Sequence, residues 1–268
     1  MQLLVLALWA LVLMVVAVLL GAVLDIPDSQ TVTQSSSHAT LFLLWNVFSQ
    51  FMMFALPVLL VAWMYYRGAQ RDFYRLDFSS RRWLLSLAGV AVMLLLVPLI
   101  DWLTVWNDGW NIPESLRKIG EGSQQTVETL MRECHPLLTL FGLALVPALC
   151  EELFFRVGIQ NLLQKWLKNS HVAIWLTAII FSLAHGELFA FLPRLLLGAL
   201  LGYLYVYGRS LLVNVMVHFA NNALVVLAYA FASGSFDPSA PLAVAPLLTA
   251  LCALTAAAVF YVSFLRRR

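Results

Sequence analysis

Residues 3–24 have the sequence LLVLALWALVLMVVAVLLGAVL, and none of these 22 side chains carries a charge. A helix needs about 20 apolar residues to cross the hydrocarbon layer, which is about 30 Å thick, because backbone polar groups inside lipid must bond to one another. The stretch therefore predicts a transmembrane helix. We do not expect a secretory signal peptide, because no basic residue precedes the apolar run and the run exceeds the usual length of about 7–15 residues.

The apolar character extends over the whole chain. Of its 268 residues, 62% are hydrophobic and 11% are charged, and the mean hydropathy is +0.86. A soluble domain has about 45–50% apolar and about 25% charged residues, so this composition predicts an integral membrane protein. It excludes a disordered chain, which needs high charge, and the three scattered cysteines exclude a disulfide-stapled secreted domain. With a net charge of +2 and no basic patch interleaved with aromatic residues, we expect no nucleic acid as a partner.

The expected fold class is all-α: a polytopic membrane helix bundle of about eight transmembrane helices in a single domain, residues 1–268. The expected spans are 3–24, 41–66, 83–103, 137–163, 172–187, 189–207, 211–232 and 242–265. The fourth span carries charges that offer a place to split it, and the fifth and sixth meet at a tight turn around Gly186. In the sixth, Gly198 and Gly202 form a G-x-x-x-G pattern, which lets a neighbouring helix approach closely. Between the third and fourth spans, residues 114–132 are expected to form either a partly amphipathic helix at the outer surface or a solvated connector.

The distribution of Lys and Arg predicts the orientation, because positive charge resists translocation. If the amino terminus lies inside, the inner segments hold 12 of the 16 basic residues, including the five arginines of residues 67–82. Nine of the 14 acidic residues then fall in outer segments. We therefore expect both termini in the cytoplasm, with the basic, aromatic-rich loop 67–82 resting on anionic membrane lipids.

Ionisable residues inside a span are functional candidates by default, because lipid does not solvate a charge. The first group lies in residues 148–156, ALCEELFFR. Glu152 and Arg156 are four residues apart, so they share a helix face and can pair, whereas Glu151 points about 100° away. An unpaired buried carboxylate is a candidate general base. The alternative is that the three charged side chains form a folding clamp or lie at the cytoplasmic edge.

Two histidines form the other polar groups. His185 ends the fifth span in the sequence FSLAH, residues 181–185, and His218 begins HFANN, residues 218–222, in the seventh. His218 and Asn222 project from one helix face, and such a pair directs two hydrogen-bond donors to one point, as a developing oxyanion requires. The alternative is a polar contact between helices. Counting the helical rise from the span ends, Glu151 and His185 lie about 20 Å deep and His218 about 12 Å, which favours a cavity that opens to the cytoplasm.

The patterns E-E-x-x-x-R, F-x-x-x-H and H-x-x-x-N, in this order on successive apolar segments, resemble the CPBP family of CaaX-prenyl endopeptidases and bacteriocin-processing or immunity proteins, also called Abi. The resemblance covers residues 148–222. It implies an intramembrane endopeptidase, without a cofactor, that cleaves a peptide bond near the cytoplasmic face. The expected substrate is a membrane-associated peptide, a lipidated protein or a small exported peptide. We expect the plasma membrane of a bacterium as its location, and membrane lipids as its other partners.

The resemblance also implies roles for single residues. Glu151 would activate a water for attack on a peptide carbonyl, and His185 would assist as a hydrogen-bond partner and proton carrier. His218 and Asn222 would stabilise the tetrahedral oxyanion. The residues expected to hold the geometry of the site are Glu152 and Arg156.

Two alternatives remain open. Two histidines and a glutamate are a sufficient zinc set with an open position for water, so Glu151, His185 and His218 can instead be metal ligands. A non-catalytic immunity or scaffold protein, or a transporter, would use the polar cluster as a binding site or relay, although the chain has no internal symmetry of the kind seen in carriers. Arg194 is expected to pair with Glu187 across the turn, or else to bind a substrate carboxylate.

Overall fold

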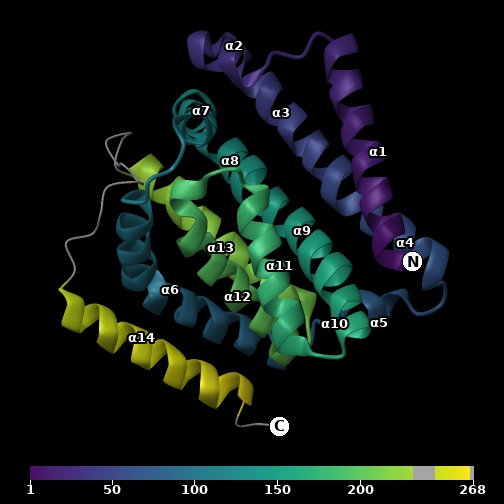
Figure 1. Ribbon diagram of the computed structural model, residues 1–268, viewed down its shortest axis with the longest axis vertical. Helices are drawn as coiled ribbons and strands as arrows, with labels where there is room; N and C mark the ends of the chain where they lie inside the picture. The colour runs from purple at the N-terminus through teal and green to yellow at the C-terminus, as the bar shows by residue number, and fades with distance from the viewer. Residues whose placement is uncertain (232–244, 266–268) are drawn as a thin grey trace.

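The expected helix bundle is confirmed in the computed structural model, which describes residues 1–231 and 245–265 (Figure 1). In this part of the chain, seven helical segments are long and apolar enough to cross a membrane. They are α1 (Gln2–Val23), α3 with η2 and α4 (Ala39–Tyr65), α6 (Ser80–Asp108), α8 to α10 (Pro136–Leu167), η5 with α12 (Leu188–Gly208), α13 (Leu211–Phe231), and α14 with η6 (Pro246–Leu265). Residues 232 and 242–244, which the sequence assigns to the last two spans, lie outside the described residues.

The fifth expected span is helical but shorter than predicted. Helix α11 (Ser170–Ala184) has 15 residues, which correspond to a length of about 22 Å. Asn169 begins it by accepting hydrogen bonds from the backbone N–H groups of His171 and Val172. It ends before Gly186, whose φ of +71° is accessible to glycine but strained for other residues. The predicted boundary at 187 was therefore three residues too late.

The fourth expected span is one continuous helix rather than two. Its successive parts are α8 (Pro136–Thr139), η3 (Leu140–Leu145), α9 (Val146–Glu151), η4 (Glu152–Gln160) and α10 (Asn161–Leu167). The segments η3 and η4 are π-helical, a widened form that occurs often at functional sites. The charged residues of the span thus lie in a widened turn and not at a break.

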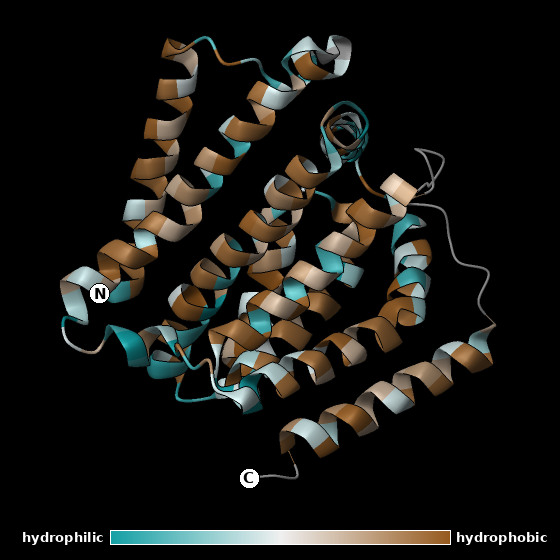
Figure 2. Cartoon of the chain, turned by 180° about the vertical axis from the view of Figure 1, so that it is seen from behind, coloured by the Kyte–Doolittle hydropathy of each residue, from teal (hydrophilic) through white to brown (hydrophobic). Residues whose placement is uncertain are grey.

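Residues 114–132, expected to be either a helix or a solvated connector, form a helix. Helix α7 (Glu114–Glu133) lies across one end of the bundle and is seen end-on in Figure 1. Its buried side includes Thr126 and Leu130, and it packs beside the short helix α2 (Ser29–Gln34) and η5 (Leu188–Ala190). Its polar residues stand out against the apolar spans in Figure 2. The helix therefore covers that end of the bundle.

The two glycines of the sixth span allow the close helix packing that the sequence predicts. A Cβ atom on Gly198 would lie 3.2 Å from the Cα atom of Ala178, and one on Gly202 would lie 2.8 Å from the Ile174 side chain. Both neighbours belong to α11. This packing fixes α11, and therefore His185 at its end, against α12.

The opposite end of the bundle holds the basic loop, with the short helix α5 (Gln70–Tyr74), and the start of α1 lies toward this end in Figure 1. Arg75 donates a hydrogen bond to the backbone oxygen of Tyr205 (2.8 Å), and Arg82 donates one to that of Gly208 (2.7 Å). Ser210 donates to the backbone oxygen of Asp77 (2.9 Å). The loop is therefore fixed against the turn between α12 and α13.

Candidate active site

The two adjacent glutamates of the fourth span have different surroundings. Glu152 accepts a hydrogen bond from Nε of Arg156 (2.9 Å), and neither side chain has any exposed surface. Glu152 also accepts one from Nδ2 of Asn214 (2.9 Å) and one from Nδ1 of His218 (2.9 Å). A buried charge needs this many partners to offset its lost hydration. Both carboxylate oxygens of Glu152 are thus hydrogen-bonded within the protein. The four-residue spacing predicts the pairing with Arg156 but not the bonds from Asn214 and His218.

Glu151 is also buried, but no described protein group forms a hydrogen bond with its Oε2 atom. Nε2 of His218 lies 3.8 Å from this oxygen, and Nε2 of His185 lies 4.0 Å from it. Most buried polar side-chain atoms in proteins have a hydrogen-bond partner, so a buried free oxygen between two imidazoles is unusual. The structure therefore brings together three of the predicted site residues around one carboxylate oxygen.

Each imidazole is oriented through its other nitrogen. Nδ1 of His185 lies 2.8 Å from the backbone oxygen of Phe181, so it must carry the hydrogen and donate it. Nδ1 of His218 faces the Glu152 carboxylate in the same way. In both side chains Nε2 is left to face Glu151. These contacts fix which nitrogen of each ring is available for chemistry.

Phe181 explains the F-x-x-x-H pattern in physical terms. Its ring lies edge-on to His185 and to His218, with centroid separations of 4.8 and 6.0 Å. The guanidinium of Arg156 lies over the same ring at 5.5 Å. One aromatic side chain thus supports both imidazoles and the ion pair behind them.

Asn222 lies in the wall of the same cavity, one turn along α13 from His218. Its Oδ1 atom accepts a hydrogen bond from Nδ2 of Asn221 (3.1 Å). This contact fixes the orientation of the Asn222 amide and leaves its Nδ2 hydrogens available as donors. The predicted donor pair of His218 and Asn222 is therefore compatible with the geometry.

The cavity at this site has a volume of about 430 Å³. Its wall includes Glu151, His185, His218 and Asn222 and, from α3, α7 and α12, side chains that the sequence did not connect with the site. These are Asn46 and Gln50 of α3, Ser123, Val127 and Met131 of α7, and Leu197 of α12. Arg194 of α12, for which the sequence offered a role in binding a substrate carboxylate, also lines the cavity. Arg194 forms the expected ion pair with Glu187 across the turn.

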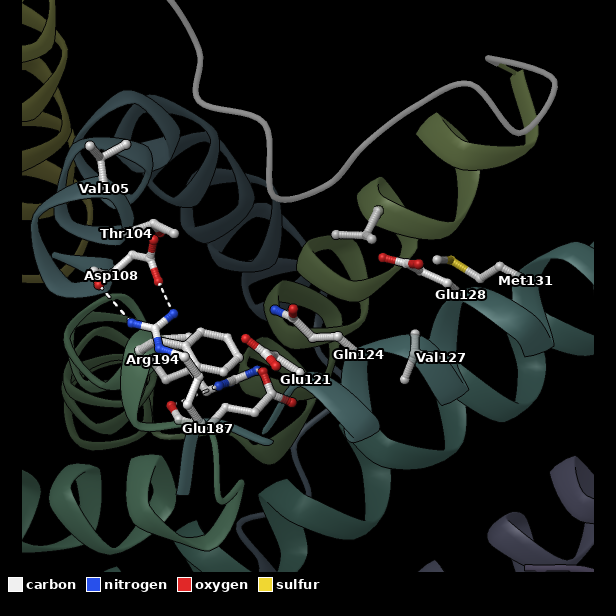
Figure 3. Close-up of a pocket in the computed structure, with 14 residues that line it drawn as sticks. Thr104, Val105, Asp108, Glu121, Gln124, Val127, Glu128, Met131, Glu187 and Arg194 are labelled. Atoms are coloured by element: carbon white, nitrogen blue, oxygen red, sulfur yellow. Dashed lines mark hydrogen bonds and ion pairs between the residues drawn. The ribbon is translucent and has the colours of Figure 1, made fainter. Parts of the chain in front are cut away.

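A second cavity of about 580 Å³ adjoins the first (Figure 3). It lies between α6, α7 and the start of α12, and it shares five wall residues with the first cavity: Val127, Met131, Glu187, Arg194 and Val225. Figure 3 shows Gln124 and Glu128 of α7 on one side and Thr104 and Asp108 of α6 on the other. Together the two cavities form a passage along α7.

Sequence reasoning missed Asn214, which fixes Glu152 from α13. A signal was present, because Asn214, His218 and Asn222 follow one another at intervals of four and form a polar stripe on an apolar helix. Gln160 was also missed. It donates to the backbone oxygen of Gly202 (3.0 Å) and is fully buried beside Arg156. Both residues extend the polar network below the cavity.

In the arrangement that the structure gives them, the three side chains are slightly farther apart than the ligands of a zinc ion. The Glu151 oxygen lies 3.8 and 4.0 Å from the two histidine nitrogens, whereas neighbouring ligands of a tetrahedral zinc ion are about 3.3 Å apart. No group of three or more His, Cys, Asp or Glu side chains in residues 1–231 and 245–265 forms a candidate metal site.

Comparison with known proteins gives one match. Residues 133–224 match the family model described as type II CAAX prenyl endopeptidase Rce1-like. Comparisons with curated proteins and with solved structures found no match for the chain. The matched segment includes all three motifs and every residue predicted for the site. This segment is therefore similar to the Rce1-like CAAX endopeptidase family, which confirms the resemblance to CPBP proteins.

Proposed function

We propose that this protein is an intramembrane endopeptidase in which Glu151 activates the attacking water. The observation that carries the proposal is the buried Oε2 atom of Glu151, which faces two imidazole nitrogens within 4.0 Å and lines a cavity of about 430 Å³. The Rce1-like family match supports a protease of the CAAX type. Glu151 is not needed for the buried ion pair, since Glu152 already forms that pair with Arg156.

The proposed reaction begins with a water bound between Glu151 and His185. Glu151 takes a proton from this water, and the hydroxide attacks the peptide carbonyl carbon. The carbonyl π bond breaks, and the oxygen becomes an oxyanion. His218, as an imidazolium whose Nδ1–H is held by Glu152, and Nδ2 of Asn222 donate hydrogen bonds to that oxygen.

The second step returns the proton. Glu151 gives it, by way of His185, to the nitrogen of the leaving amine. The oxyanion re-forms the carbonyl double bond, and the C–N bond breaks with its electron pair leaving on the nitrogen. The products are a new carboxyl terminus and a new amino terminus, so water is the only co-reactant consumed. The buried network of Glu152, Arg156 and Asn214 takes no part in proton transfer and holds His218 in place.

We propose a peptide or a lipidated protein as substrate, with membrane lipids around the bundle and no cofactor. The test uses detergent-purified protein and a panel of peptides, prenylated and not prenylated. The Glu151→Gln variant should lose cleavage by at least 100-fold, a size typical for removal of a general base. Glu114→Gln is the matched control, because Glu114 is an exposed glutamate on α7 that contacts Lys118.

Two results would lead to other functions. If a strong zinc chelator abolishes cleavage by the wild type, Glu151, His185 and His218 act as metal ligands. If a stably folded Glu151→Gln protein cleaves at the normal rate, the glutamate mechanism is wrong. If neither protein cleaves any peptide of the panel, a scaffold or immunity function is favoured over catalysis.

A further inference from the structure

The two ends of the helix bundle differ in charge. The end with the short helix α5 carries eight basic and two acidic side chains, namely Arg67, Arg71, Arg75, Arg81, Arg82, Lys165, Lys168 and Arg209 with Asp72 and Asp77. The end with α2 and α7 carries seven acidic and three basic side chains, namely Asp25, Asp28, Asp108, Glu114, Glu121, Glu128 and Glu133 with Arg117, Lys118 and Arg132. Because basic residues stay on the cytoplasmic side, the α7 end faces outward.

The cavity at Glu151 reaches the α7 end of the bundle. Its wall includes Ser123, Val127 and Met131 of α7, and it continues into the second cavity along the same helix. The separate hollow at the basic end, lined by side chains such as Arg71, Asp72 and Arg209, shares no residue with it. In the described part of the chain, the passage therefore leads away from the basic end.

A packed polar layer closes the cavity toward the basic end. The side chains of this layer have no exposed surface; they are Glu152, Arg156, Gln160 and Asn214. Beneath them lies the fully buried ring of Tyr205, and the guanidinium of Arg75 from the basic loop stacks on it at 4.2 Å.

The short helix α11 makes the outer end accessible. At about 22 Å it falls about 8 Å short of a hydrocarbon layer of about 30 Å, so the turn after His185 lies below the outer surface. Helix α7 lies over this recess, where Gly120 contacts the ring of Phe189. The helical rise places His218 in the inner half of the membrane, but depth along a helix does not decide from which side a site is reached.

We propose that the cavity receives its substrate from the outer side of the membrane, along α7. The substrate class is then an extended segment of an exported or membrane-anchored peptide on the outer side, and not a prenylated tail in the cytoplasm. This inference rests on the proposed peptidase function for its substrate, but its geometric part does not. It replaces the expectation of a cavity that opens to the cytoplasm.

The orientation can be tested by labelling of intact cells with a membrane-impermeant maleimide. Ser123→Cys on α7 and Ser80→Cys at the basic end are a matched pair of exposed serines, with the wild type as a blank for its three native cysteines. Ser123→Cys should be labelled in intact cells, and Ser80→Cys only after permeabilisation. The reverse pattern would overturn the proposal. Gln125→Cys and Ser170→Cys provide a second exposed pair if either first variant folds poorly.

The route of the substrate can be tested with membrane vesicles. The probe is a peptide that the detergent-purified protein cleaves, fused to a soluble protein too large to cross the bilayer. Right-side-out vesicles should cleave it, and inside-out vesicles should cleave it only after detergent is added. Cleavage by inside-out vesicles alone would overturn the outward route. If the purified protein cleaves nothing in detergent, the proposed function fails, while the maleimide labelling still decides the orientation.

Discussion

Replacement of Arg156 by methionine should destabilise the fold more than any exposed substitution. Arg156 has no exposed surface, and its Nε atom lies 2.9 Å from Glu152. Methionine fills a similar length but leaves the Glu152 carboxylate without its only permanent positive partner. Removal of one partner from a buried ion pair costs about 3–5 kcal/mol. Glu152 keeps its hydrogen bonds from Asn214 and His218, so we expect the lower value, about 3 kcal/mol.

The double variant Glu152→Gln with Arg156→Met separates the ion pair from the packing. Glutamine offers its oxygen to Nδ2 of Asn214 and its amide hydrogens to Nδ1 of His218, which accepts in the other neutral tautomer, and the buried charge is gone. Because replacement of both members of a buried pair is often neutral, the double variant should be within about 1 kcal/mol of the wild type. The assay is unfolding by sodium dodecyl sulfate in mixed micelles, followed by circular dichroism. The reasoning is refuted if the single change costs less than about 1 kcal/mol, or if the double change costs as much as the sum of the single ones.

Three further predictions concern the α7 end, the basic loop and the oxyanion donor. The Gly120→Ala change should destabilise the fold by about 1 kcal/mol, because its Cβ would lie 2.5 Å from the Phe189 ring. The Gly122→Ala change should be neutral or stabilising, because nothing lies within 4 Å of its Cβ. Thermal unfolding distinguishes the two variants, and equal effects would contradict the packing of Gly120 against Phe189. The backbone N–H of Ser79 and the guanidinium of Arg82 lower the pKa of Asp77 from 3.8 to about 2, so its stabilising effect is present above pH 3.8 and is lost as the pH falls toward 2. The Asp77→Asn variant should therefore show a weaker dependence of the unfolding midpoint on pH over that range. If the midpoint of the variant depends on pH as strongly as that of the wild type, the role given to Asp77 is contradicted. Asn222→Ala should lower kcat about 100-fold to 1,000-fold with little change in KM, measured with a peptide that the wild type cleaves, and a change in KM alone would remove it from oxyanion binding.

Much of the fold follows from composition and apolar periodicity. Each expected span became a helix in the described residues, because lipid leaves the backbone no other partner for its polar groups. The end of α11 did not follow, since hydropathy continues past Ala184 to the point where Gly186 adopts a positive φ. A turn that depends on one residue's conformation leaves no trace in a hydropathy profile.

The candidate site was predictable in its residues but not in its surroundings. The motif spacing places Glu152 and Arg156 on one face, and the structure shows them paired. The contribution of α3 to the wall through Asn46 and Gln50 was not predictable, because about a hundred residues separate them from Glu151 and no pattern links them. The direction of the passage depends on where α7 lies, and that is set by tertiary contacts such as the one between Gly120 and Phe189.

The contrast between the adjacent glutamates is the strongest physical reason to expect chemistry at this site. Glu152 is bound by three partners and behaves as a structural ion, whereas Oε2 of Glu151 is buried without a hydrogen bond from any described protein group. A buried acceptor left unsatisfied lowers the stability of a fold, typically by about 1–3 kcal/mol. An apolar residue at position 151 would remove this cost if the side chain served packing alone. The cost is therefore understandable if the oxygen is kept free for a water and a substrate, in a cavity where two imidazoles already face it.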